Sequence, residues 1–188
     1  MYNNKKNSNN IERVNRHTSI ETGIYVGNEL LRFCKTNLFH HEVEIFLPIT
    51  FRDMKLEEAQ RKYFSEHRPQ IIKTNEDGSV NFTFNLVDKE IGKEQLEAVI
   101  DDFYQVLKRF QPMSVCLETG SELEEPVPFA WMEFVSNAID ENLYNMLTIY
   151  PMGTKLLMGM FNCPFKERTK WVHCIAQIRK SILIRNNK

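Results

Sequence analysis

The pair of residue types best suited to covalent chemistry is a thiol and an imidazole near the C-terminus. Cys163 precedes His173 by ten residues, and Cys174 follows the histidine directly. A nucleophilic cysteine needs a base within hydrogen-bond reach and surroundings that lower its pKa. Pro164 removes a backbone donor beside Cys163, and the sequence offers no identifiable Asn or Asp to orient the histidine. A small thiol-dependent or hydrolytic enzyme centred on Cys163 and His173 is therefore the alternative function, not the leading one.

A second group, His40-His41-Glu42 with Glu44, has the side chains that bind zinc or iron. These residues precede or begin an alternating segment that ends at Pro48. Adjacent residues of a strand point to opposite faces, so the two histidines cannot share one ion without a bend. The H-E-x-x-H spacing of helical zinc sites is also absent. We predict no metal site here, only an exposed entry to a strand.

Two acidic groups could serve hydrolysis or calcium binding, namely Asp101-Asp102 and the segment with Glu122, Glu124 and Glu125. The aspartates fall on the polar side of a predicted helix. The glutamate segment lacks the Asp/Asn-rich spacing and central glycine of a calcium loop. Solvated surfaces explain both groups, and we predict no catalytic residue among them.

Bulk composition disfavours several classes of partner. The 188 residues carry a formal net charge of -1, which leaves no excess of Lys and Arg to neutralise phosphates. Gly153 and Gly159 form no phosphate-binding motif. No stretch approaches the ~20 apolar residues of a membrane span, and no apolar run follows Lys5 and Lys6 as in a signal peptide. We expect no cofactor, no nucleic-acid or membrane partner, and a cytoplasmic location.

The elements that would position these groups follow from hydrophobic periodicity. A continuous apolar stripe predicts a helix over residues 93–111, ended by Pro112, and shorter patterns predict helices over residues 55–64 and 166–183. Alternation and turn residues predict strands at residues 24–33 with a turn at 27–28, and at 41–48, 70–74, 80–86, 114–117, 127–135, 143–150 and 155–161. Asp77-Gly78 predicts a hairpin between the third and fourth of these.

Most consecutive strands are joined by turns too short for a parallel crossover. The sequence therefore predicts an α+β fold, with an antiparallel β-sheet and three packed helices in an α/β/α sandwich. Residues 1–20 are rich in Asn, Lys and Ser and are predicted to be a flexible N-terminal arm. Residues 21–188 are predicted to form a single domain.

This order of elements resembles that of the PsbP-like α/β/α sandwich superfamily, over roughly residues 23–183. The resemblance lies in the strand EVEIFLP, the short helix before HRPQI, the Asp77-Gly78 hairpin, the long amphipathic helix and the final strands ending in GMFN. The superfamily includes a Ran-binding nuclear import protein, DcrB-like lipoproteins and cytoplasmic chaperones for secreted effectors. The resemblance implies an adaptor, chaperone or assembly factor and not an enzyme, and it carries over no functional residues.

The late strands, from Val127 to Phe161, are unusually rich in Met and aromatic residues. Core packing on both faces of a sheet explains such a composition. Flexible, Met-rich apolar surface also suits binding of a partner segment. We predict a non-catalytic protein-binding module whose partner contacts an open part of the sheet, and the candidate partner-binding residues are Trp131, Tyr144, Met146 and Met158. A homodimer burying the same surface is the second alternative.

Overall fold

The structure is a computed structural model, and it describes residues 16–63, 68–124, 126–138 and 140–185. Its strands are β1 (Thr18–Ser19), β2 (Gly23–Val26), β3 (Glu29–Leu31), β4 (Phe33–Leu38), β5 (Val43–Pro48), β6 (Arg52–Asp53), β7 (Ile71–Thr74), β8 (Asn81–Val87), β9 (Val115–Glu122), β10 (Phe129–Asn137), β11 (Asn142–Met152), β12 (Lys155–Pro164) and β13 (Leu183–Ile184). Its helices are α2 (Leu56–Lys62), α3 (Leu96–Phe110) and α4 (Arg168–Lys180), with 3₁₀ turns η1 (Lys93–Gln95) and η2 (Phe165–Glu167).

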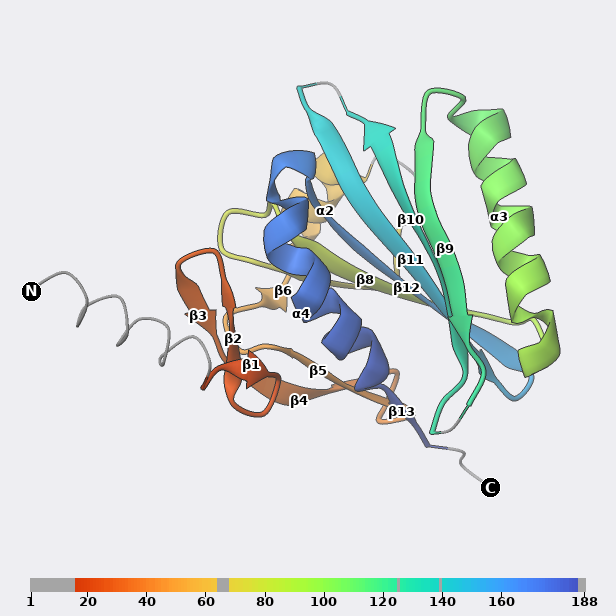
Figure 1. Cartoon of the computed structure of the whole chain (residues 1–188), viewed down its shortest axis with the longest axis horizontal. Helices are drawn as coiled ribbons and strands as arrows, with labels where there is room; N and C mark the ends of the chain where they lie inside the picture. Colours follow the sequence, from red (N-terminus) through yellow and green to blue (C-terminus); the bar gives the residue numbers. More distant parts are fainter. Residues whose placement is uncertain (1–15, 64–67, 125, 139, 186–188) are drawn as a thin grey trace, which may run out of the picture.

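A seven-stranded sheet in the order β6-β7-β8-β12-β11-β10-β9 forms the middle of the molecule (Figure 1). Its paired strands run antiparallel throughout. The long strands β10, β11 and β12 follow one another through tight turns, as the sequence predicts for a meander. The predicted α+β class is therefore confirmed, with helices against an antiparallel sheet.

The β7–β8 hairpin forms where the Asp77-Gly78 pair predicts it. Gly78 has a φ of 79°, a left-handed conformation that favours glycine. Oδ1 of Asp77 accepts a hydrogen bond from the Ser79 backbone N–H at 2.8 Å, and Oδ1 of Asn75 accepts one from the Val80 N–H at 3.0 Å. These side-chain bonds replace backbone partners at the tip and hold the turn in one shape.

We call the sheet face beneath α4 the front face. Along β11, the side chains of Tyr144, Met146 and Tyr150 point to it and are at most 2% exposed. They pack with the buried face of α4 and with two small sheets, β13-β5-β4 and β1-β2-β3, which lie on the same side (Figure 1). The front face is thus covered by a helix and two sheets in one continuous core.

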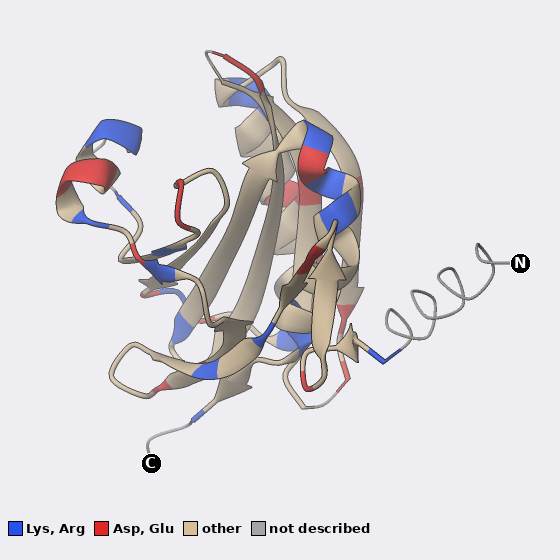
Figure 2. Ribbon diagram, turned by 90° about the vertical axis from the view of Figure 1, so that its left-hand side faces the viewer, with Lys and Arg blue, Asp and Glu red and all other residues tan. Residues whose placement is uncertain are grey.

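The opposite, back face carries α3. Its apolar stripe packs on alternate residues of the same strands, including Met132, Leu147 and Ile149. The predicted stripe is confirmed through Leu107, whereas Phe110 at its end is 75% exposed. The shorter helix α2 lies on the side of the sheet away from α4 (Figure 2). The predicted three-layer arrangement follows from these two faces.

Three parts of the chain differ from the sequence predictions. Residues 1–15 of the predicted arm lie outside the described residues, but Thr18–Ser19 forms β1 and Ile20 packs in the front core. The strand predicted at residues 24–33 is divided into β2, β3 and the start of β4. Finally, the closing helix ends at Lys180, and Leu183–Ile184 returns as β13 alongside β5.

No helix in the described part of the chain is long and apolar enough to cross a membrane.

Candidate functional site

A cleft opens on the front side between three segments that are distant in sequence. The β2–β3 turn, the β7–β8 hairpin and the start of α4 enclose two adjoining hollows of about 540 and 610 Å³. The two hollows share Glu29, Asn75, Asp77 and Trp171, so we treat them as one surface and call it the front cleft. A space of this size accepts a small ligand or a few side chains of a partner.

The floor of the front cleft is apolar and rigid. Leu31, Phe51 and Trp171 line it, and Trp171 is only 6% exposed. The ring centroids of Phe51 and Trp171 are 6.1 Å apart, and that of Phe161 lies 5.4 Å from Trp171. Because these rings belong to the front core, packing fixes the floor. Its accessible aromatic surface comes mainly from Phe51, which is half-buried, since little of the Trp171 ring is exposed.

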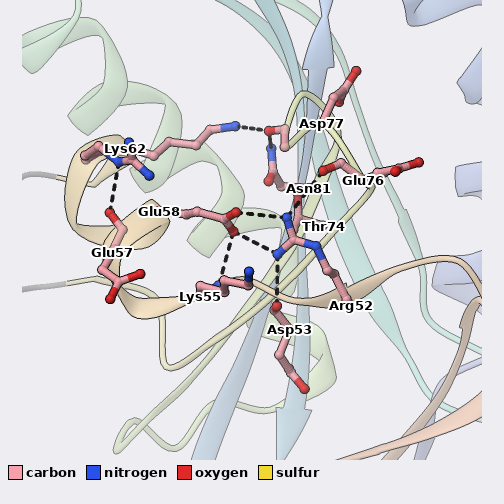
Figure 3. A network of polar contacts seen from close by, with 12 residues as sticks. Arg52, Asp53, Lys55, Glu57, Glu58, Lys62, Thr74, Glu76, Asp77 and Asn81 are labelled. Carbon is pink, nitrogen blue, oxygen red and sulfur yellow. Dashed lines mark hydrogen bonds and ion pairs between the residues drawn. The ribbon is translucent and has the colours of Figure 1, made fainter.

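One wall of the front cleft is held by a polar network around Arg52 (Figure 3). The Arg52 guanidinium donates to both carboxylate oxygens of Glu58 in α2, at 2.8 and 3.0 Å, and to the Glu76 carbonyl at 3.3 Å. Lys62 of α2 donates to the Gly78 carbonyl at 2.7 Å. A guanidinium and a carboxylate joined by two hydrogen bonds have a fixed relative orientation. The network therefore ties the hairpin tip to β6 and α2 and fixes the position of the rim.

Charge on the lining of the front cleft is unbalanced. Each basic residue there forms an ion pair, Arg52 with Glu58, Lys166 with Glu141 and Lys170 with Glu167. The other acidic residues of the lining are Glu29, Glu76 and Asp77, and none of them is in an ion pair within the described residues. The lining thus carries more acidic than basic side chains, although Lys62 and Arg52 lie near enough to Asp77 and Glu76 to interact with them electrostatically.

Asp77 is held in its charged form. Hydrogen bonds from the side chain and then the backbone of Ser79 lower the pKa of the Asp77 carboxyl below its usual value. The carboxylate is therefore ionised at neutral pH. A cation over the aromatic floor would meet this charge from the hairpin side.

The four predicted partner-binding residues do not form one surface. Tyr144 and Met146 are 0% and 2% exposed on the front face beneath α4, so a partner cannot reach them in this arrangement. Trp131 and Met158 are half-buried, the first packed against the front core and the second against the back core. The prediction of one open patch is corrected because β-strand alternation and α4 divide its members.

Trp131 is covered from two sides. The Arg179 guanidinium carbon lies 3.9 Å from the indole centroid, a cation–π contact between α4 and β10. Gly120 of β9 lies against the same ring, where an added Cβ would be only 2.3 Å from Cζ2. The indole therefore occupies the space that a side chain at position 120 would need.

The structure opposes a thiol nucleophile at Cys163. Its side chain is 0% exposed, and burial raises the pKa of the thiol to about 12. The His173 imidazole is exposed on α4, where Nε2 lies 3.2 Å from the Thr18 carbonyl and 2.9 Å from the Gln177 amide nitrogen. Among the described hydrogen bonds, none joins Cys163 to an imidazole, so the geometry does not supply the base that the alternative function needs.

The two histidines of the candidate metal group lie exposed at the entry to β5, as predicted. His40 and His41 lie in the turn between β4 and β5, with φ values of 54° and 70°. The Glu44 carboxylate forms ion pairs with Lys35 and Arg185, with N–O distances of 2.9 and 2.8 Å. Over the residues that the structure describes, no three His, Cys, Asp or Glu side chains gather as metal ligands.

Sequence reasoning missed the front cleft. Glu29, Glu76 and Trp171 come from three separate elements, and none belongs to a recognisable motif. The available signal was the turn chemistry of Gly27-Asn28 and Asp77-Gly78, which placed two acidic turns on the surface. The two turns meet beside α4 only because the β1-β2-β3 sheet packs there, and local sequence patterns do not specify that packing.

No protein-family model matches the chain, and no curated protein is similar to it in sequence. Solved structures do share its fold. Cyanobacterial PsbP (CyanoP) from Synechocystis is similar with a TM-score of 0.61 at 9% identity, over 85% of this chain and 96% of that one. The Ran-binding protein Mog1p from Saccharomyces cerevisiae has a TM-score of 0.52 at 11% identity, over 82% and 96%. Protein PA94 from Pseudomonas aeruginosa has a TM-score of 0.51 at 8% identity, over 82% and 99%. The chain has the PsbP-like fold that the order of elements predicts.

Proposed function

We propose that this protein is a non-catalytic protein-interaction module, of the adaptor, chaperone or assembly-factor kind, that receives a basic segment of a partner in the front cleft. The single observation that carries the proposal is the cleft itself, with its aromatic floor and the net acidic charge of its lining. The Ran-binding activity named for Mog1p, which shares the fold, is consistent with an interaction role. The thiol-enzyme alternative is not favoured, since Cys163 is buried.

The chemistry of the segment follows from the lining. Lys or Arg side chains can lay their aliphatic stems on Phe51 and Trp171 while their charged ends reach the rim. Rim charges that stay partly solvated act mainly on association rate and on the choice of partner. Binding should therefore weaken as salt rises, because screening acts on exposed charges.

The experiment compares a Lys/Arg-rich peptide with an acidic peptide of equal length. Nuclear magnetic resonance titration of the full chain should show shifts at the front cleft with the basic peptide alone. The double reversal Glu29→Lys with Glu76→Lys should weaken that binding about tenfold or more at low salt. Both side chains are exposed and make no side-chain hydrogen bond within the described residues, so the fold should tolerate the change.

The matched control is Asp88→Lys with Glu90→Lys, which alters the net charge equally on exposed residues after β8. It should leave peptide affinity within about twofold, since screening separates distant surface charges. An equal loss of peptide affinity in both double variants would show only a general effect of net charge. Shifts that spread elsewhere, or equal binding of the acidic peptide, would overturn the proposal.

A further inference from the structure

The last strand of the large sheet leaves one side without a partner. In the described ranges, β9 pairs with β10 alone, over residues Val115 to Glu122. A long sheet edge of this kind presents free backbone groups that can pair with another strand. The other edge strand, β6, has only two residues. The β9 edge is therefore the one with enough length to extend the sheet.

Apolar side chains lie at the start of this edge, before the exposed Glu118. Val115 is 55% exposed, and Leu117 is 40% exposed at a register shift that leaves it outside the β9–β10 pairs. Met113, just before the strand, is 72% exposed. Exposed apolar residues grouped on an unpaired edge favour association over a solvated end to the sheet.

The helix above the edge carries opposite charges at its two ends. Glu97 accepts a hydrogen bond from the Ser121 hydroxyl at 2.5 Å, near the end of β9. Lys108 donates to the Ser114 carbonyl at 3.2 Å, at the residue before β9. Asp101 lies on the same flank, four residues after Glu97. The flank of α3 over the edge is thus acidic toward one end of β9 and basic toward the other.

We propose that the β9 edge is the interface of a homodimer, in which two copies of the chain pair β9 with β9 antiparallel about a two-fold axis. This symmetry reverses the polarity of α3, so Lys108 of each copy faces Glu97 and Asp101 of the other. Strands lie about 4.8 Å apart, and α3 packs mainly on β10, with further contacts to β9 and β11. The two α3 helices, each centred near β10, then lie roughly 14 Å apart, a separation that a Lys and a Glu side chain can span together.

The charge pattern selects a second copy over an unrelated strand. An isologous interface needs a surface that complements itself when rotated by half a turn. The flank of α3 has this property because its acidic and basic groups lie on either side of its midpoint. A strand from another protein would pair with the backbone of β9 but would not account for the charges on the helix.

Sedimentation velocity of the full chain from about 1 to 100 μM tests the dimer, since its population depends on concentration. Lys108→Glu and Glu97→Lys should each raise the dissociation constant about tenfold, because every dimer contains the contact twice. An equimolar mixture of the two variants should restore association, since each supplies the charge that the other lacks. Recovery in the mixture is not expected from a variant that simply unfolds.

Arg109→Glu and Asp102→Lys are the matched controls. Arg109→Glu makes the same charge change as Lys108→Glu one residue along α3, about 100° around the helix. Asp102→Lys makes the same change as Glu97→Lys five residues along, about 140° around it. These variants should dimerise like the original chain. A monomer at every concentration would overturn the proposal, and so would a dimer that both pairs of variants leave unchanged. Neither result affects the peptide binding proposed for the front cleft.

Discussion

The two faces of the seven-stranded sheet are covered to different extents. The front face lies under α4 and two small sheets, and its side chains join one aromatic core. The back face packs under α3, while Met158 and Met160 remain partly exposed beside that core. The comparison shows that a Met- and aromatic-rich strand can owe its composition to burial on one face and leave only a few residues accessible on the other.

Two residues of β12, three positions apart, should show the largest difference in stability between the faces. Phe161 on the front has its ring centroid 4.9 Å from that of Phe82 and is 3% exposed. Phe161→Ala should lower the free energy of unfolding by about 3–5 kcal/mol, through lost transfer energy and a cavity. Met158→Ala on the back should cost about 1 kcal/mol, since part of that side chain is already in water.

Urea unfolding of the two variants measures both values, because the change in midpoint at constant slope reports stability. Equal losses would mean that the back face is as fully packed as the front. A loss at Met158 larger than that at Phe161 would reverse the comparison.

A smaller difference is expected between buried polar residues on the two faces. Glu133 on the front is 4% exposed and pairs with Arg168 of α4 at 2.9 Å. Glu133→Gln should cost about 1–3 kcal/mol, since it leaves the guanidinium without its charged partner. Asn145 on the back donates to the Ser136 hydroxyl at 2.9 Å, and Asn145→Ala should cost about 1 kcal/mol. Thermal unfolding of both variants checks which of them loses more stability. A Glu133→Gln variant as stable as the original chain would contradict the prediction.

The smallest effect concerns pH and the outer part of the front layer. A hydrogen bond from Lys35 and, after it, contacts with Arg185 lower the pKa of Glu44 below its ordinary value of 4.5. A carboxyl whose folded pKa is lowered stabilises the fold above its unfolded pKa, and this contribution is lost as pH falls through the folded value. Amide exchange in β13, which pairs with β5 at Glu44, should therefore quicken below about pH 4.5.

Amides of α3 should change less over the same range, because its packing on the back face is apolar. Glu44→Gln should remove most of the pH dependence of exchange in β13. An identical acid response in the variant and the original chain would assign the effect to other carboxyl groups.

Local sequence patterns predict much of the fold because several elements are specified by their own residues. The Asp77-Gly78 turn and the apolar stripe of α3 need no distant partner to be identified. β13 could not be predicted in this way. Its two residues become a strand only because the chain returns alongside β5, where Leu183 pairs with Glu44 and Ile184 with Val43, residues far apart in the sequence.

The candidate site was harder to predict than the fold. The sequence marks Tyr144 and Met146 as apolar and aromatic, but the same types serve a core and a binding surface equally well. The position of α4 decides between these uses, and it places both residues inside. Glu29 and Glu76 look like ordinary surface charges until the β2–β3 turn and the hairpin are brought to one cleft.

The contact of Trp131 with Gly120 gives the chain a fluorescence reporter at the sheet edge. The protein has two tryptophans. The indole of Trp131 lies between the edge strand and Arg179, whereas Trp171 lines the front cleft. A version with only Trp131 would follow events at β9 by its emission, and one with only Trp171 would follow peptide entry. Two spectroscopic signals, already separated by the fold, can thus distinguish self-association from partner binding without an added label.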